Sequence, residues 1–147
     1  MHLAGLYPQA TFTLVDANTD AISLARKATR NLNSTCVIGN IYNLALTSDS
    51  HDLVTCWQTL SWLDKPKFAL RELVRFCKPG GLILASSLFN LNHDVDIYSK
   101  VIDHTRASSR LGITYAYNTY SLCTVQGWLS GLVASFRIHE FNMPEDL

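Results

Sequence analysis

The sequence lacks an excess of charge of either sign, since its 12 basic and 12 acidic side chains cancel. The pI is near 6.9. Proteins that bind DNA, RNA or an anionic membrane surface usually carry a basic patch, which this composition does not favour. We therefore expect no nucleic-acid partner and no membrane partner.

Long apolar runs are absent as well. No run approaches the roughly 18 apolar residues that suggest a membrane-spanning helix. The N-terminus, MHLAGLYPQA, has neither the basic start nor the long apolar core of a signal peptide. These absences predict a cytoplasmic protein.

Closely spaced cysteines are the third absence. The 4 cysteines lie far apart in the sequence, with no C-x-x-C pair and no histidine at a ligand spacing. This spacing argues against a zinc site and favours half-buried thiols in a reducing compartment. We expect no metal.

What is present is a globular composition, with 48% hydrophobic and 16% charged residues in a chain of 147. A chain of this length is enough for one domain with a single substantial core. No internal repeat, low-complexity tract or linker interrupts it. We therefore expect a single domain over residues 1–147.

Apolar periodicity along the first 87 residues predicts an α/β fold. Strands are expected at 11–15, 34–39, 52–57 and 82–87. The expected helices are the end of one at 2–7, one capped by Asn18 or Asp20, and one capped by Asp64 that stops at Lys78-Pro79-Gly80-Gly81. Crossovers of a dozen or more residues where helices intervene are typical of a mostly parallel sheet covered by helices.

The pattern weakens after Ser87. We expect a polar-faced helix at 93–108, an aromatic loop or extended segment at 112–121, a short helix at 122–132 and a strand at 133–141.

Polar and aromatic residues follow three of the expected strands, where ligands bind in open parallel sheets. Asp16 follows the first strand, where a carboxylate can accept from both ribose hydroxyls of a nucleotide; alternatively, together with Asn18, it only starts a turn or caps a helix. Asn40 and Ile41 follow the second, where an amide can pair with an adenine edge; the alternative is an ordinary Gly-Asn turn. Trp57 and Gln58 follow the third, and Trp57 fits a packed core as well as a ligand wall.

The order and spacing of these residues resemble the class I S-adenosylmethionine-dependent methyltransferases, especially those that act on small molecules. The segments that carry the resemblance are LVDANTDAISLARK (14–27), VIGNIYNL (37–44) and HDLVTCWQTLSWLDKPKFALRELVRFCKPGGLILASS (51–87). The last is the most specific, because an aspartate-led strand, an amphipathic helix and a K-P-G-G turn occur in the family's order. The resemblance implies a Rossmann-like, mostly parallel sheet and S-adenosylmethionine as the cofactor.

The resemblance also implies roles for individual residues. Asp16 would hold the ribose hydroxyls, with Ala17 beside the adenine. Asn40 stands where the family usually has an aspartate that accepts from the adenine amino group, which an amide oxygen can also do. Ile41 would pack on the adenine.

The rest of the implied site concerns the reacting groups. Trp57 and Gln58 would lie near the sulfonium and the methionine portion. Many relatives carry a histidine where this chain has Ser61-Trp62, so no general base is assigned and the catalytic residues stay unknown. The aromatic residues expected to bind the acceptor, with ordinary core or surface packing as the alternative, are Trp62, Tyr117 and Tyr120.

Two segments of the family pattern have no counterpart in the sequence. The family's first strand and glycine-rich loop would precede Met1, and its last antiparallel strand would follow Leu147. We therefore expect an incomplete domain with impaired activity. Its exposed strand edges would be covered by a second copy or by a partner protein.

Three functions remain open at this point. The first is methyl transfer to a small-molecule acceptor. The second is a catalytically silent methyltransferase-like module that binds a partner protein. The third is a nicotinamide-dependent dehydrogenase, which the K-P-G-G turn, the VIGN-I segment and the lack of a Tyr-x-x-x-Lys pair all disfavour.

Overall fold

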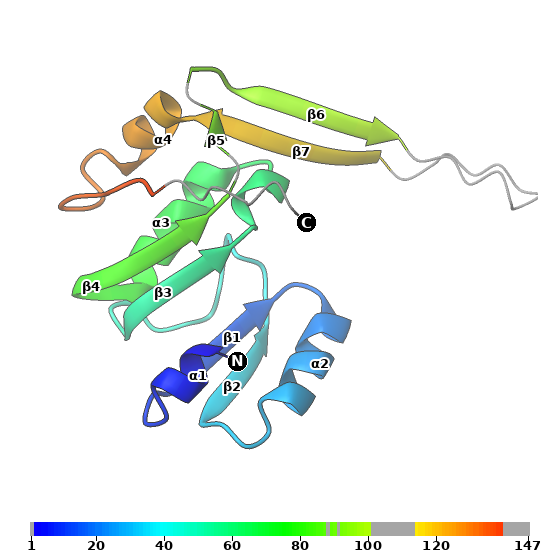
Figure 1. Ribbon diagram of the computed structural model, residues 1–147, viewed down its shortest axis with the longest axis vertical. Helices are drawn as coiled ribbons and strands as arrows, with labels where there is room; N and C mark the ends of the chain where they lie inside the picture. The colour runs from blue at the N-terminus through cyan, green and yellow to red at the C-terminus, as the bar shows by residue number, and fades with distance from the viewer. Residues whose placement is uncertain (1, 88, 91, 101–113, 140–147) are drawn as a thin grey trace, which may run out of the picture.

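The computed structural model describes residues 2–87, 89–90, 92–100 and 114–139. Figure 1 shows β1, β2, β3 and β4 pointing in one direction, with helices packed on them. The elements in chain order are α1 (His2–Leu6), β1 (Phe12–Asp16), α2 (Thr19–Ala28), β2 (Ser34–Ile38), β3 (His51–Trp57), the 3-10 helix η1 (Leu60–Trp62), α3 (Pro66–Phe76), β4 (Cys77–Ser86), β5 (Phe89–Asn90), β6 (Val95–Lys100), β7 (Thr114–Ser121) and α4 (Leu122–Leu129). The expected α/β class is confirmed.

The first unit consists of β1 and β2, paired in parallel and covered by α2. α2 begins after Asn18, whose side-chain oxygen accepts from the backbone N–H groups of Asp20 and Ala21 at 2.8 and 3.3 Å. These bonds satisfy donors that have no partner within the helix. Ile22 is buried on the inner face of α2. Of the two caps expected from the sequence, Asn18 is the correct one.

The second unit consists of β3 and β4, also parallel, with α3 packed on one face. The apolar period of α3 places its buried side chains toward the strands. The core cluster is formed by Cys56, Leu60, Ala69, Leu70 and Leu73. This core lies directly beneath the carboxyl end of β3.

The start of α3 differs from the sequence-based expectation. Lys65, and not Asp64, is the residue at the N-cap, and its side chain makes no capping bond. Asp64 instead accepts a hydrogen bond from the Tyr42 hydroxyl at 2.6 Å. The expected cap was wrong because a residue 22 positions away in the sequence occupies that carboxylate.

The K-P-G-G segment lies inside β4 and not before it. β4 begins at Cys77, residues 78–81 bulge out, and pairing resumes at Leu82 opposite Leu53 of β3. Gly80 takes a positive φ of 80°, which a glycine adopts without steric cost. The expected turn is therefore a bulge in a longer strand.

The two parallel units are separate sheets among the described residues, since no backbone ladder joins β1 to β3. A hydrogen bond between His51 Nε2 and Thr13 Oγ1, at 3.2 Å, links the two strands near their starts. Each of these two sheets has two parallel strands.

The last part of the chain is mainly antiparallel. β6 pairs with β7, and the short β5 pairs with the other edge of β7. The helix expected at 93–108 is wrong over residues 95–100, which form β6; residues 101–108 lie outside the described residues. Val95 and Ile97 lie two positions apart, a spacing that suits a strand. Pairing with β7 supplies the backbone hydrogen bonds that this strand needs.

The remaining expectations for this part have mixed outcomes. The segment expected at 112–121 is extended as β7 from Thr114, and α4 confirms the short helix. The strand expected at 133–141 is wrong over residues 133–139, which pair with no described strand, and residues 140–141 lie outside the described residues. None of the helices that the structure describes has the length and apolar character needed to cross a lipid bilayer.

Candidate functional site

The carboxyl ends of the parallel strands lie at one edge of the fold, as the arrowheads of β1 to β4 show (Figure 1). Asp16 is the last residue of β1, and the next strand ends are followed by polar or aromatic side chains. The cofactor candidates at these ends are Asp16, Ala17, Asn40, Ile41, Trp57 and Gln58. Every cofactor candidate therefore lies at or just after the end of a strand, and these strands point in the same direction.

Asp16 is exposed and held by the turn that follows it. Its Oδ1 accepts from the backbone N–H of Asn18 at 2.8 Å. No contact with a described residue engages its other carboxylate oxygen. The backbone carbonyl of Asp16 accepts from the Gly39 N–H at 3.0 Å, which joins the ends of β1 and β2. The carboxylate is thus oriented by the turn and still open to a ligand.

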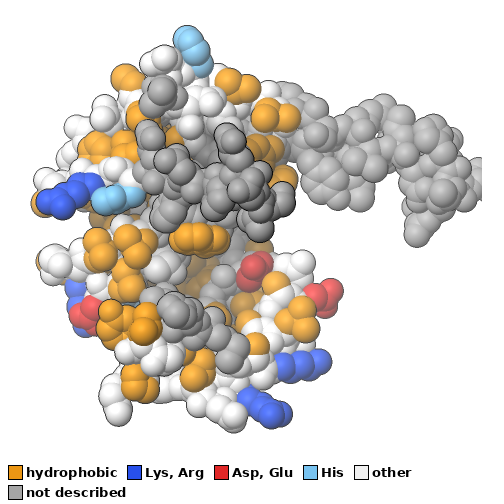
Figure 2. All heavy atoms as spheres, in the orientation of Figure 1, with side chains coloured by type: hydrophobic (Ala, Val, Ile, Leu, Met, Phe, Trp, Pro, Cys, Tyr) orange, Lys and Arg blue, Asp and Glu red, His pale blue; other side chains and the backbone are white. Residues whose placement is uncertain are grey.

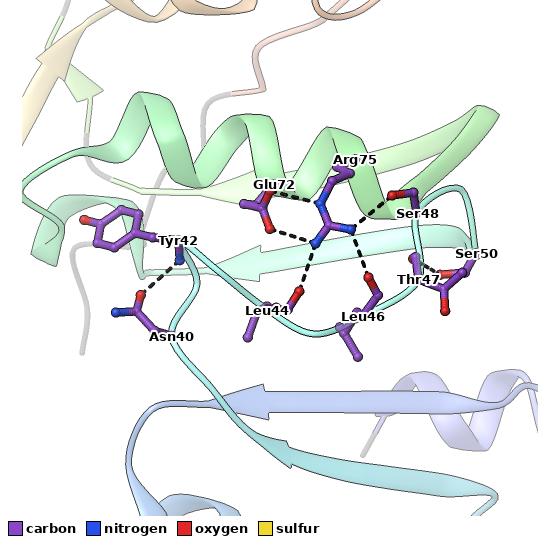
Figure 3. A network of polar contacts seen from close by, with 9 residues as sticks. All are labelled: Asn40, Tyr42, Leu44, Leu46, Thr47, Ser48, Ser50, Glu72 and Arg75. Atoms are coloured by element: carbon purple, nitrogen blue, oxygen red, sulfur yellow. Dashed lines mark hydrogen bonds and ion pairs between the residues drawn. The ribbon is translucent and has the colours of Figure 1, made fainter.

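Asn40 closes a turn with its own side chain. Its Oδ1 accepts from the backbone N–H of Tyr42 at 3.0 Å (Figure 3). A carbonyl oxygen has two lone pairs, so a second donor can still be accepted. Ile41 is half-buried and packs against the core cluster under β3. This turn places a polar and an apolar residue side by side.

Trp57 and Gln58 lie at the end of β3. The Trp57 side chain is 69% exposed, so the packed-core alternative for it is wrong. Gln58 adopts a positive φ of 48°, and its backbone N–H donates to the Ser86 carbonyl at 3.0 Å. A non-glycine residue in this conformation costs of order 1–3 kcal/mol, and such residues cluster at functional sites.

The expected acceptor residues do not form one continuous wall. Trp62 and Tyr117 pack edge to face, with ring centroids 4.8 Å apart. Tyr120 packs instead on Trp128, at 4.9 Å, and its hydroxyl donates to the Leu63 carbonyl at 3.3 Å. Tyr117 and Tyr120 are three positions apart on β7, so their side chains leave opposite faces of the strand. One aromatic pair therefore includes Trp62 of η1, and the other is linked to Leu63, the residue that follows η1.

Sequence reasoning missed Tyr42, which connects the cofactor candidates to this aromatic region. Its hydroxyl donates to Asp64 at 2.6 Å and accepts from the Lys65 backbone N–H at 3.1 Å. Burial and the hydrogen bond to Asp64 raise the pKa of Tyr42, and the same bond lowers the pKa of Asp64. No local signal marks Tyr42, because both partners are more than twenty positions away.

The buried side chains next to the site have packing roles. Ser61 is fully buried, and its hydroxyl is hydrogen-bonded to the Ser87 hydroxyl. Burial raises the pKa of the Cys56 thiol, which keeps it protonated and poorly nucleophilic. Neither residue has the environment of a general base or a nucleophile.

A family model described as "Methyltransferase domain" matches residues 1–85, a range that includes every cofactor candidate. The chain belongs to this family. The expected class I S-adenosylmethionine-dependent methyltransferase is confirmed, and S-adenosylmethionine is the cofactor of that family. Tyr117 and Tyr120 lie beyond the matched range.

The most similar proteins include a malonyl-[acyl-carrier protein] O-methyltransferase from Halalkalibacterium halodurans, 28% identical over 146 residues. That alignment covers 91% of this chain and 51% of the relative, so the chain spans about half the relative's length.

Two solved structures show the same fold. One is an S-adenosylmethionine-dependent methyltransferase from Methanosarcina mazei, with a TM-score of 0.69 and 17% identity over 97% of this chain and 79% of that chain. The other is a complex of the Haloferax volcanii Trm112 methyltransferase activator with a methyltransferase, with a TM-score of 0.63 and 16% identity. This second alignment covers 88% of the present chain and 54% of the matched chain.

Proposed function

We propose that this chain is an S-adenosylmethionine-dependent methyltransferase domain that transfers a methyl group to a small-molecule acceptor. The observation that carries the proposal is that cofactor candidates lie at or just after the ends of β1, β2 and β3, which all point in the same direction. The family match over the same residues supports it.

The described residues fit the nucleoside part of the cofactor. The second carboxylate oxygen of Asp16, which no described residue engages by a hydrogen bond, can accept from a ribose hydroxyl. Asn40 offers a second lone pair to the adenine amino group, and Ile41 offers an apolar surface beside it. S-adenosylmethionine supplies an electrophilic methyl group on a sulfonium. Trp57 and Gln58 would orient that end of the cofactor and exclude water from it.

We also expect the 147-residue chain to bind the cofactor weakly by itself. The sequence contains no G-x-G pair, and its adjacent glycines, Gly80 and Gly81, lie in the bulge of β4. No glycine-rich loop for the methionine portion is therefore present in these 147 residues. Two missing hydrogen bonds to a charged group cost about 3–6 kcal/mol, at ~1.5–3 kcal/mol each. This corresponds to a loss of about a hundred- to ten-thousand-fold in affinity.

Titration calorimetry with S-adenosylmethionine tests the proposal. The samples are the 147-residue chain and the same chain extended at its N-terminus by the first strand and glycine-rich loop of a family member. Binding that strengthens in the extended chain and is lost with Asp16→Ala supports the proposal. Lack of binding by both chains would contradict it.

A second candidate function is a module that binds a partner protein, and the bare face of the β3–β4 sheet favours it. α3 covers the other face, whereas apolar side chains on this face are exposed, namely Leu53, Trp57, Leu82 and Leu84. Figure 2 shows hydrophobic side chains on the side of the molecule where β3 and β4 run. Exposed apolar patches often mark protein interactions.

The mass in solution separates the two candidates. A partner-binding or self-associating module gives a mass by light scattering that rises with concentration, without cofactor affinity. A monomer that binds S-adenosylmethionine counts against this second function.

A further inference from the structure

Arg75, in the last turn of α3, uses all of its N–H groups as hydrogen-bond donors. A guanidinium has five such donors. Nε and Nη2 donate to the Glu72 carboxylate at 3.0 and 2.8 Å, and Nη2 also donates to the Leu44 carbonyl at 2.9 Å. Nη1 donates to the Leu46 carbonyl at 2.9 Å and to Ser48 Oγ at 3.0 Å (Figure 3).

This arrangement is more than an ion pair on a helix surface. The bond between Arg75 and Glu72 alone, three residues apart on α3, would contribute little to stability. The remaining bonds reach Leu44, Leu46 and Ser48, which lie 27 to 31 positions before Arg75 in the sequence. These three residues belong to the loop at 39–50. The guanidinium therefore fastens the loop between β2 and β3 to the end of α3.

The fastened loop is in direct contact with the turn that carries the cofactor candidates. Leu44, whose carbonyl Arg75 holds, is only 7% exposed and packs against Gly39. A methyl group added to Gly39 would lie 2.5 Å from Leu44 Cδ2. Gly39 in turn donates its N–H to the Asp16 carbonyl and precedes Asn40. A continuous path of contacts thus runs from Arg75 to the ends of β1 and β2.

The other end of the loop is fastened independently. Tyr42 is bonded to Asp64 and to the Lys65 N–H, at the start of α3. The turn at 39–41 therefore lies between β2 and the rest of the loop, residues 42–50, which is tied to both ends of α3. Such a support fixes the position of a binding turn without touching the ligand.

We propose that Arg75 is a positioning residue for the turn at 39–41. Through this turn, Arg75 sets the preference of the site for a purine that carries an amino group, as adenine does, over one that carries an oxo group. The inference rests on the proposed function, because it assigns that turn to the adenine. Arg75 acts through Leu44 and Gly39, so its loss changes the placement of Asn40 and not its chemistry.

The test uses Arg75→Lys, which keeps the charge but cannot reproduce the planar set of donors. The matched control is Arg71→Lys on the same helix, since Arg71 lies over the Phe68 ring at 5.6 Å and makes no bond to the loop. Gly39→Ala is a second variant that disturbs the same path. All are measured at a temperature where circular dichroism shows each protein folded.

The first measurement is the affinity ratio between S-adenosylhomocysteine and S-inosylhomocysteine, which carries an oxo group where adenine has its amino group. The wild-type chain is expected to prefer the adenine ligand. Arg75→Lys and Gly39→Ala should lower the ratio by about two- to thirtyfold, and Arg71→Lys should leave it unchanged. A purely structural role lowers both affinities together and keeps the ratio, which would overturn the inference.

The second measurement needs no ligand. Hydrogen exchange at the Gly39 N–H, which donates to Asp16, should accelerate in Arg75→Lys and stay unchanged in Arg71→Lys. Unchanged exchange in Arg75→Lys would overturn the coupling itself. If neither the 147-residue chain nor its N-terminally extended form binds either ligand, the proposed function fails and the adenine role falls with it, while hydrogen exchange still tests the path from Arg75 to Gly39.

Discussion

Residues 12–86 and residues 89–129 are built on different principles. The first region consists of parallel strand pairs covered by α2 and α3, and it presents its cofactor candidates at strand ends. The second is an antiparallel hairpin with α4, attached through side chains such as Asn118 and Tyr120, both of which donate to the Leu63 carbonyl. The family match covers almost all of the first region and none of the second.

This difference leads us to infer separate roles for the two regions, one for the cofactor and one for the acceptor. Parallel strands end at a common edge, so under the proposed function the first region would hold the cofactor there. Among the described residues, the second region contacts η1 through the pair of Trp62 and Tyr117, and its α4 packs against the core beside α3. We infer that variants in the first region change cofactor affinity, whereas variants in the second change acceptor use and local stability.

The largest effect is expected at the end of β1. Asp16→Ala should weaken S-adenosylmethionine binding by about 1.5–3 kcal/mol, because a charge-assisted hydrogen bond to the ribose is lost. Asp20→Ala is the matched control, since Asp20 lies in the first turn of α2, where Asn18 provides the cap. Titration calorimetry measures both. Equal affinities would remove Asp16 from the ribose site.

A smaller effect is expected at the end of β2. Asn40→Leu should weaken cofactor binding by about 1 kcal/mol, because leucine accepts no hydrogen bond from the adenine amino group or from Tyr42. Asn40→Asp should keep or improve the affinity, since a carboxylate accepts at least as well. Normal binding by Asn40→Leu would make Asn40 a turn former only.

The second region should respond in stability and not in cofactor affinity. Tyr120→Phe removes the hydrogen bond to the Leu63 carbonyl and should lower the free energy of unfolding by about 0.5–1.5 kcal/mol. Tyr117→Phe keeps the ring packing on Trp62 and serves as the control. Urea denaturation measures the free energy of unfolding, and titration calorimetry measures the cofactor affinity. A tenfold loss of cofactor affinity in Tyr120→Phe would contradict the inference that the second region does not contribute to cofactor binding.

The smallest effect concerns pH and the attachment of α4. The Ser121 backbone N–H, bonded to Asp94, lowers the pKa of that carboxyl, with further help from the side chains of Thr124 and Ser121. Because the folded pKa is depressed, this stabilisation is present above about pH 3.9 and is lost as the pH falls through the folded pKa. Asp94→Asn should therefore lose some stability at neutral pH and match the wild type in acid. Urea denaturation at several pH values measures the difference, and an equal deficit at every pH would contradict it.

The same contrast explains how much of the fold could be predicted. β1, α2, β2, β3 and α3 each follow a local period of apolar residues, so the sequence alone predicts them. Residues 95–100 fit a helix as well as a strand locally, and only pairing with β7 decides between them. Residues 133–139 alternate like a strand but have no described strand beside them.

The candidate site shows the same limit of local information. Site residues at strand ends, such as Asp16 and Asn40, can be predicted from the sequence because the apolar pattern shows where each strand ends. The contacts that hold them, from Tyr42 to Asp64 and from Arg75 to Leu44, join positions far apart in the sequence. No local pattern predicts such contacts, which is why the expected Asp64 cap was wrong.

The central claim is that the carboxyl ends of β1, β2 and β3 form one cofactor site, and amide chemical-shift mapping tests it most directly. The isotope-labelled chain is titrated with S-adenosylhomocysteine, a method that detects weak binding as well as strong. We predict shifts at Asp16, Ala17, Asn40 and Ile41 and at the Trp57 indole, with little change in residues 114–129. Shifts confined to residues 89–129, or none up to the solubility limit of the ligand, would contradict the claim.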